Sequence, residues 1–200
     1  MPESSAAPER SANARYSATA VILHWLIAVA IIYNLWVGLG FDDLEASHSP
    51  LLRPAIDLHK SIGITVIGLV LMRILWKAGH LAPAPLPGLK PWERGLSIGV
   101  HHLLYLLMVL VPLAGWLHDS AWKAAVEHPL VLYGTVPWFR LPLFGGLSDA
   151  GKDTWHTIFG AVHAIAAKVL IGALVLHVAG ALKHQFIDGK AQFRRMWFGK

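Results

Sequence analysis

Four long runs of apolar residues alternate with short polar segments along the chain of 200 residues. The runs cover residues 21–41, 56–76, 97–117 and 158–182. Each has the roughly 20 residues that a helix needs to cross a hydrocarbon core about 30 Å thick. The short alternating segments of a membrane β-barrel are not visible, and neither is an internal repeat. The pattern predicts an all-α membrane protein folded as one four-transmembrane-helix bundle.

Composition supports this interpretation and limits the possible chemistry. Hydrophobic residues make up 55% of the chain and charged residues only 14%, and nine residues are Trp. The mean hydropathy of +0.51 is high for a soluble domain. The chain has no cysteine, which excludes disulfides, iron–sulfur clusters and thiolate-ligated haem within it. Its twelve histidines make imidazole the abundant type of metal ligand.

The positive charge is distributed as expected for a membrane protein rather than a nucleic-acid-binding one. The formal net charge is +5, but the basic residues flank the apolar runs instead of forming one patch. By the positive-inside rule, we expect both termini of a multi-pass membrane protein in the cytoplasm. The first run is a full span without a small-residue cleavage site, so we expect an uncleaved helix.

Three units are predicted along the chain. Residues 1–15 form a flexible cytoplasmic N-terminus, residues 16–185 the four-helix membrane domain, and residues 186–200 a basic cytoplasmic tail. We expect a short outer loop at 42–55, ending near Pro54. The outer segment 118–155 is too aromatic and apolar for a disordered linker, so we expect it to lie along the membrane surface.

The last apolar run carries histidines at a spacing that suits two metal centres. His163 and His177 are fourteen positions apart, which is about 40° short of four full helical turns and a rise of roughly 21 Å. Both imidazoles therefore leave one face of the helix, near opposite sides of a bilayer. One such helix could hold two stacked haems, provided that other helices supply one further histidine for each iron.

Depth in the bilayer selects the partners. His24 lies near the cytoplasmic start of the first span, level with His177, whereas His59 lies near the outer start of the second span, level with His163. Because an unpaired imidazole inside a membrane is costly, two level pairs that share one helix favour ligation over a purely structural role. Two imidazoles on each iron leave no open position, which favours electron transfer over oxygen binding. Zinc or copper would need three or four ligands at one level.

Other histidines leave alternatives open. His101 or His102, near the cytoplasmic end of the third span, could replace His24 as the inner ligand or bind a propionate or a quinone. His118 is rotated about 100–160° away from them, so the third span cannot present two haems on one face.

The remaining polar residues of interest lie outside the favoured pairs. His156 and His184 would place two irons roughly 42 Å apart, so we expect them at the interfaces, with His184 a candidate for a proton-linked substrate site. Lys168 points away from the face of His163 and can extend its ammonium to the interface. Three loop histidines are expected to be solvated: His48, His80 and His128.

Several motifs of this chain resemble those of the bacterial cytochrome b561 family. They are LHW at 23–25, LHKSIG at 58–63, HHLLYLLMVLVPLAGW at 101–116, VH at 162–163 and LHVAGALKHQFIDGK at 176–190. Each motif is short, and the specificity lies in their order and spacing. The resemblance implies two b-type haems held by His24, His59, His163 and His177, together with quinone chemistry. Lys168 departs from the family pattern.

These observations lead to one main functional prediction and two alternatives. The main prediction is a di-haem b-type cytochrome that transfers single electrons across the membrane. The resemblance implies a bacterial inner membrane, with superoxide or another outer donor and ubiquinone as the redox partners. The sequence leaves open whether it is an oxidoreductase or a pure electron carrier. The first alternative is a membrane-anchor subunit that accepts electrons from a dehydrogenase or hydrogenase partner. The second is a haem-free transport or structural protein whose histidines bind protons or metal ions. Three outer basic residues could attract superoxide: Lys123, Arg140 and Lys152.

Overall fold

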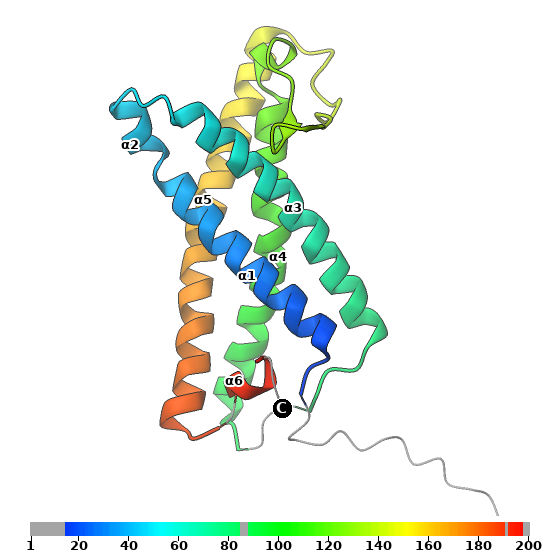
Figure 1. Cartoon of the computed structure of the whole chain (residues 1–200), viewed down its shortest axis with the longest axis vertical. Coiled ribbons are helices and arrows are strands. Elements are labelled where there is room, and N and C mark those ends of the chain that lie inside the picture. Colours follow the sequence, from blue (N-terminus) through cyan, green and yellow to red (C-terminus); the bar gives the residue numbers. More distant parts are fainter. Residues whose placement is uncertain (1–14, 85–87, 191, 198–200) are drawn as a thin grey trace, which may run out of the picture.

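The computed structural model describes residues 15–84, 88–190 and 192–197. Within them, four helices are long and apolar enough to cross a membrane. They are α1 (Ala18–Leu39), α3 (Leu52–Gly79), α4 (Pro91–Ser120) and α5 (Asp149–Leu182). The four run alternately up and down in one elongated bundle (Figure 1). The four-helix membrane fold predicted from the apolar runs is therefore confirmed.

Local capping extends the helices beyond the apolar runs. The Ser17 side chain accepts the Ala20 N–H at the start of α1, and Ser148 does the same for Gly151 in α5. Helix α3 begins at Leu52 and includes Pro54. A proline is tolerated there because it falls in the first turn, where its missing N–H breaks no helical hydrogen bond. The prediction of a loop over 42–55 was therefore wrong: α2 (Phe41–Ala46) and the start of α3 occupy much of it.

The long connection between α4 and α5 is ordered and folds back on the bundle. It contains a 3-10 turn, η1 (Lys123–Val126), and two short antiparallel strands, β1 (Val131–Leu132) and β2 (Val136–Pro137). At the tip of this hairpin, the Tyr133 N–H donates to Ser61 Oγ at 2.9 Å and the Tyr133 hydroxyl lies 2.7 Å from Thr65 Oγ1. These contacts attach the connection to α3.

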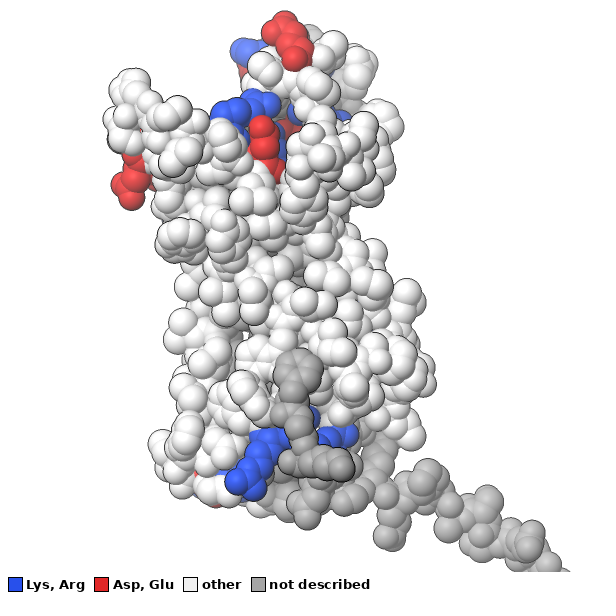
Figure 2. Space-filling model, in the orientation of Figure 1, with Lys and Arg blue, Asp and Glu red and all other residues white. Residues whose placement is uncertain are grey.

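The bundle has a small core and an apolar exterior. Helix α1 packs on α3 and α4 packs on α5, while α3 and α4 join the two pairs. Val70 and Leu170 are among the buried residues between the helices, whereas Trp36 and Leu75 are 70% and 72% exposed on the outside. Figure 2 shows charged side chains gathered at the two ends of the visible face, with a band of uncharged residues between them. This distribution is the one expected for helices that face lipid.

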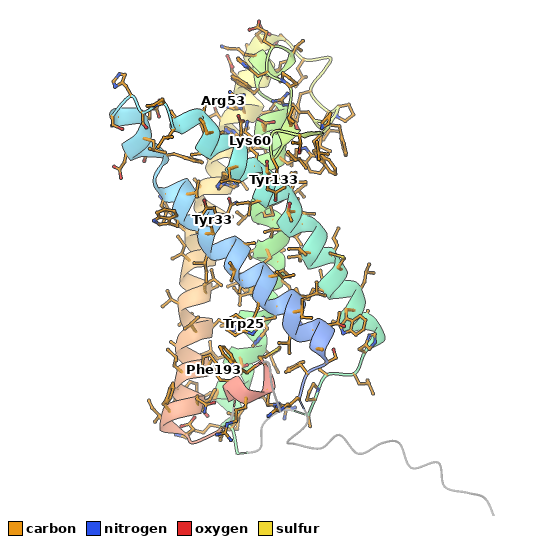
Figure 3. All side chains as sticks on the ribbon, viewed as in Figure 1. Trp25, Tyr33, Arg53, Lys60, Tyr133 and Phe193 are labelled. Carbon is orange, nitrogen blue, oxygen red and sulfur yellow. The ribbon has the colours of Figure 1, made fainter. Side chains whose placement is uncertain are left out.

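The C-terminal segment contacts the end of the bundle at which α1 begins. It includes a π-helical turn, η2 (Lys183–Ile187), and α6 (Gln192–Arg195). The Trp25 indole N–H donates to the Met196 carbonyl at 2.7 Å, and the Arg195 guanidinium donates to the Ala84 carbonyl at 2.6 Å. Trp25 and Phe193 lie at this end in Figure 3, opposite Lys60. Part of the predicted tail is thus packed against the membrane domain.

Candidate functional site

The first histidine pair lies between α3 and α5, near the end that carries the α4–α5 connection. The rings of His59 and His163 have centroids 5.9 Å apart and cross at 81°. His59 Nδ1 donates to the Asn34 carbonyl at 3.1 Å, and His163 Nδ1 donates to the Val111 carbonyl at 2.8 Å. Because a carbonyl only accepts, each Nδ1 carries the proton and each Nε2 keeps a free lone pair. This is the tautomer that a metal ligand needs.

Two glycines make room for these rings. A Cβ on Gly38 of α1 would lie 3.0 Å from Cε1 of His59, and a Cβ on Gly115 of α4 would lie 3.0 Å from Nδ1 of His163. Any larger residue would have to displace the neighbouring imidazole. The neighbouring helices therefore set the position of each ring through both a hydrogen bond and close packing.

The second histidine pair lies between α1 and α5, toward the opposite end. The His24 and His177 ring centroids are 6.2 Å apart and the rings are inclined at 60°. His101 of α4 also faces His177, at 5.0 Å and 86°. His101 Nδ1 donates to the Ser97 carbonyl, so its Nε2 is free as well. The structure brings the predicted pair together and also brings one of the two alternative ligands to the same place.

Both predicted pairs fit a haem iron by distance and by donor type. A metal–imidazole bond is about 2.0 Å, so two imidazoles on opposite sides of one iron have ring centroids roughly 6 Å apart. The described residues contain no group of three or more His, Cys, Asp or Glu side chains able to hold a bare metal ion. A porphyrin supplies four nitrogens itself and needs only two axial ligands from the protein. Pairs of imidazoles therefore suit haem better than zinc or copper.

A third pair, which the sequence did not predict, has a different geometry. The rings of His118 and His156 are stacked 3.7 Å apart, too close to hold an iron between them. His118 Nδ1 donates to the His156 carbonyl at 2.7 Å, and His156 Nδ1 donates to the His118 carbonyl at 2.9 Å. A Cβ on Gly160 would lie 3.0 Å from the His118 ring. Gly160, one helical turn after His156, is the small residue that makes room for the His118 ring, and the pair joins α4 to α5.

A buried ion cluster lies near the His59–His163 pair. Asp119, only 6% exposed, accepts from Lys60 at 2.6 Å and from Arg140 at 2.8 Å. Lys123, another residue predicted to attract superoxide, pairs with Asp153 at 3.0 Å. Carboxylates therefore offset part of the positive charge that the sequence suggested for anion attraction.

A second ion cluster lies where α5 ends. Lys183 Nζ donates to Glu93 at 2.7 Å and to Asp188 at 2.9 Å. His184 Nδ1 lies 2.7 Å from the same Asp188 carboxylate. Hydrogen bonds from Lys183 and then from His184 hold the pKa of Asp188 below its usual value. His184 therefore has a titratable partner at the end of the bundle.

The other polar residues singled out in the sequence lie away from the two candidate ligand pairs. His102 Nδ1 donates to the Ile98 carbonyl of its own helix, and its side chain is exposed. Lys168 is also exposed on α5. His80 and His128 stack on Trp76 and Trp122, with centroids 3.6 Å and 4.9 Å apart. His48 is exposed.

Comparison with known proteins reveals related sequences along most of the chain. The family model described as prokaryotic cytochrome b561 matches residues 15–199. Cytochrome b561 homolog 2 of Escherichia coli is 33% identical over 183 residues, covering 91% of this chain and 90% of that protein. The probable superoxide oxidase CybB of Yersinia pestis is 24% identical and covers 86% of this chain and 90% of its own length. Cytochrome b562 of Cereibacter sphaeroides is 25% identical, with 86% and 88% covered.

Proposed function

Because this chain belongs to the prokaryotic cytochrome b561 family, we propose that it carries single electrons across a bacterial inner membrane, from a donor at the outer face to ubiquinone. Membership makes it a membrane electron-transfer protein that binds b-type haem. Its four spans make it a multi-pass protein of the lipid bilayer. The number of haems, their ligands, the electron donor and the acceptor belong to the proposal.

The observation that carries the proposal is that α5 contributes one histidine to each of two pairs at haem-ligand separation. We assign His59 and His163 to an outer haem and His24 and His177 to an inner haem. The pair separations of 5.9 Å and 6.2 Å support these assignments. Bound in this way, each haem supplies a one-electron carrier without an open coordination position. Two carriers along one helix suit transfer from one membrane face to the other.

The chain's own residues orient the ligands and keep water out. The carbonyls of Asn34 and Val111 hold His59 and His163 in the tautomer with a free Nε2, and such bonds raise the basicity of the ligand. Buried apolar side chains fill the bundle core, among them Val66, Val70, Leu107 and Leu170. A dry surrounding of this kind strengthens electrostatic effects on a redox centre.

Superoxide is the proposed donor and ubiquinone the proposed acceptor. Support for superoxide comes from the name of the Yersinia relative, a probable superoxide oxidase. Support for ubiquinone comes from the resemblance to the family. Reduction of a quinone consumes protons, and His184, hydrogen-bonded to Asp188, is a group that could supply one. The basic residues around the chain ends support placing this end of the bundle, and both termini, in the cytoplasm.

The first experiment is a haem-to-protein count with redox spectra of the purified protein. We expect two haems in the wild type and one disturbed haem in each of four variants: His24→Ala, His59→Ala, His163→Ala and His177→Ala. His80→Ala and His128→Ala are matched controls and should keep both haems, since those rings stack on tryptophans away from the pairs. Protein without a reversible bis-imidazole haem spectrum would favour a haem-free transport or structural role.

The second experiment identifies the donor. Superoxide should reduce the haems of the purified protein without any partner, and high ionic strength should slow the reduction if the outer cations attract the anion. Reduction only in the presence of a dehydrogenase or hydrogenase would favour the membrane-anchor function instead. Reduction by superoxide at a rate independent of ionic strength would support superoxide as the donor but would contradict its attraction by the outer cations.

A further inference from the structure

Arg73 is a cation within α3 whose side chain bridges three helices. Its Nε donates to the Tyr105 hydroxyl of α4 at 3.1 Å, and its Nη1 donates to the Ala20 carbonyl of α1 at 2.6 Å. These two bonds fix the guanidinium inside the bundle rather than extended to the surface. Because an arginine side chain stays protonated in proteins, its charge is permanent.

The guanidinium lies at the level of the inner histidines. Ala20 precedes His24 by four residues on α1, which is about one helical turn or 6 Å along the axis. Because Arg73 Nη1 is 2.6 Å from the Ala20 carbonyl, its charge lies about one helical turn from His24 along α1. An iron held between the rings of His24 and His177 would therefore lie close to a fixed positive charge.

The cation beside the outer pair belongs to an ion cluster. Lys60, which follows His59 in the sequence, pairs with the buried Asp119 at 2.6 Å, and Asp119 also pairs with Arg140 at 2.8 Å, so that two cations share one carboxylate. In the described chain, Arg73 pairs with no carboxylate, and the groups that it contacts are neutral: a phenol and a main-chain carbonyl. Arg73 therefore places a full positive charge beside the inner pair.

We propose that Arg73 raises the reduction potential of the inner haem and so favours electron transfer toward the cytoplasmic end. This inference rests on the proposed function. Reduction lowers the charge of a haem by one, so a nearby uncompensated cation favours the reduced form, and it does so strongly in a medium of low dielectric constant. Transfer of one electron inward oxidises the outer iron from ferrous to ferric and reduces the inner iron from ferric to ferrous. One electron moves, and no bond forms or breaks.

Arg73 acts here as a positioning residue, and the readout is a redox titration of the purified holoprotein followed by absorbance. We expect Arg73→Gln to lower the midpoint potential of one haem and to leave the other unchanged. The haem that shifts should be the one that remains in His163→Ala and is lost in His177→Ala. Arg73→Lys keeps the charge and should keep a potential near that of the wild type.

Lys77 provides the matched control. It lies one turn further along α3, over the Tyr105 ring at 4.9 Å, but its side chain is exposed and screened by solvent. Lys77→Gln should therefore shift neither potential appreciably. Arg73→Met is a second charge-free variant that places no polar group among apolar side chains. Either charge-free variant that retains both haems is sufficient for the measurement.

Several results would overturn the inference. The proposed role would be excluded if a charge-free variant with two haems had unchanged midpoint potentials. It would also be excluded if both potentials shifted equally, or if only the potential of the outer haem shifted. Loss of the inner haem from both charge-free variants, but not from Arg73→Lys, would make Arg73 a structural residue instead. A wild type without two haems would instead contradict the proposed function, so the two failures are distinguishable.

Discussion

His163 Nδ1 donates a 2.8 Å hydrogen bond to the Val111 carbonyl on the neighbouring helix. Gly115, one turn after Val111 on α4, lies against the same imidazole, so that an added Cβ would be 3.0 Å from Nδ1. Helix α4 thus sets the tautomer and the position of an imidazole that belongs to α5. As a proposed haem ligand, His163 should therefore be sensitive to changes on α4, a helix that supplies neither proposed ligand of that haem.

Gly115→Ala should weaken binding of the proposed outer haem without changing either of its proposed ligands. The new methyl group would displace the His163 ring, and changes to groups that orient a ligand typically cost about 10–100-fold in metal affinity. The measurement is haem retention during dilution or competition with apomyoglobin. Gly99→Ala on the same helix is the control, since an added Cβ there has no neighbour within 4 Å. Equal retention in the two variants would contradict the role given to Gly115.

Substitution of His24 and of His101 should give different results. The His24–His177 separation of 6.2 Å matches two axial ligands, whereas the His101–His177 separation of 5.0 Å is shorter. We expect His24→Ala to lose the inner haem and His101→Ala to retain it with at most a shifted spectrum. Difference spectra at low temperature resolve the two haems. If His24→Ala retained both haems and His101→Ala lost one, the inner ligand would be His101.

Asp119→Ala should destabilise the protein far more than Asp153→Ala. Asp119 is buried and pairs with Lys60 and Arg140, so its removal leaves two cations without their partner, at a cost of about 3–5 kcal/mol. Asp153 is 51% exposed and pairs with Lys123, and such surface pairs contribute about 0–1 kcal/mol. Thermal unfolding in detergent compares the two variants. Similar melting temperatures would show that the buried cluster contributes little.

The contact between η2 and Asp188 should weaken in acid. Hydrogen bonds from Lys183 and His184 lower the pKa of Asp188 in the folded state, so its ionised form favours folding. This stabilisation is fully present above the unfolded pKa of 3.8 and is lost as pH falls through the lower folded pKa. Asp188→Asn should therefore have a lower melting temperature than the wild type at pH 6, and the difference in melting temperature should shrink below pH 3.8. A difference independent of pH would argue against an ionic contact.

The number and type of spans follow from the sequence alone. Backbone groups in a bilayer must be satisfied within the segment, so a run of about 20 apolar residues has essentially one stable conformation. For the same reason, the depth of His24, His59, His163 and His177 followed from counting residues along each span. Helical periodicity alone put His163 and His177 on one face of α5. The ligand roles of all four stay predictions.

Only the tertiary structure decided which side chains meet across helices. These contacts depend on how each helix is rotated and on how the helices cross, which lipid-facing sequences specify weakly. Examples are the Nδ1 hydrogen bonds to Asn34 and Val111, the stacking of His118 on His156 and the placement of His101 beside His177. The ends of α3 and the fold of the α4–α5 connection were also beyond the apolar pattern. They depend on Pro54 in a first turn and on a distant contact between Tyr133 and Ser61. The number of residues along a span determines the depth of a side chain in the membrane, whereas the close packing of the helices determines which side chains it contacts.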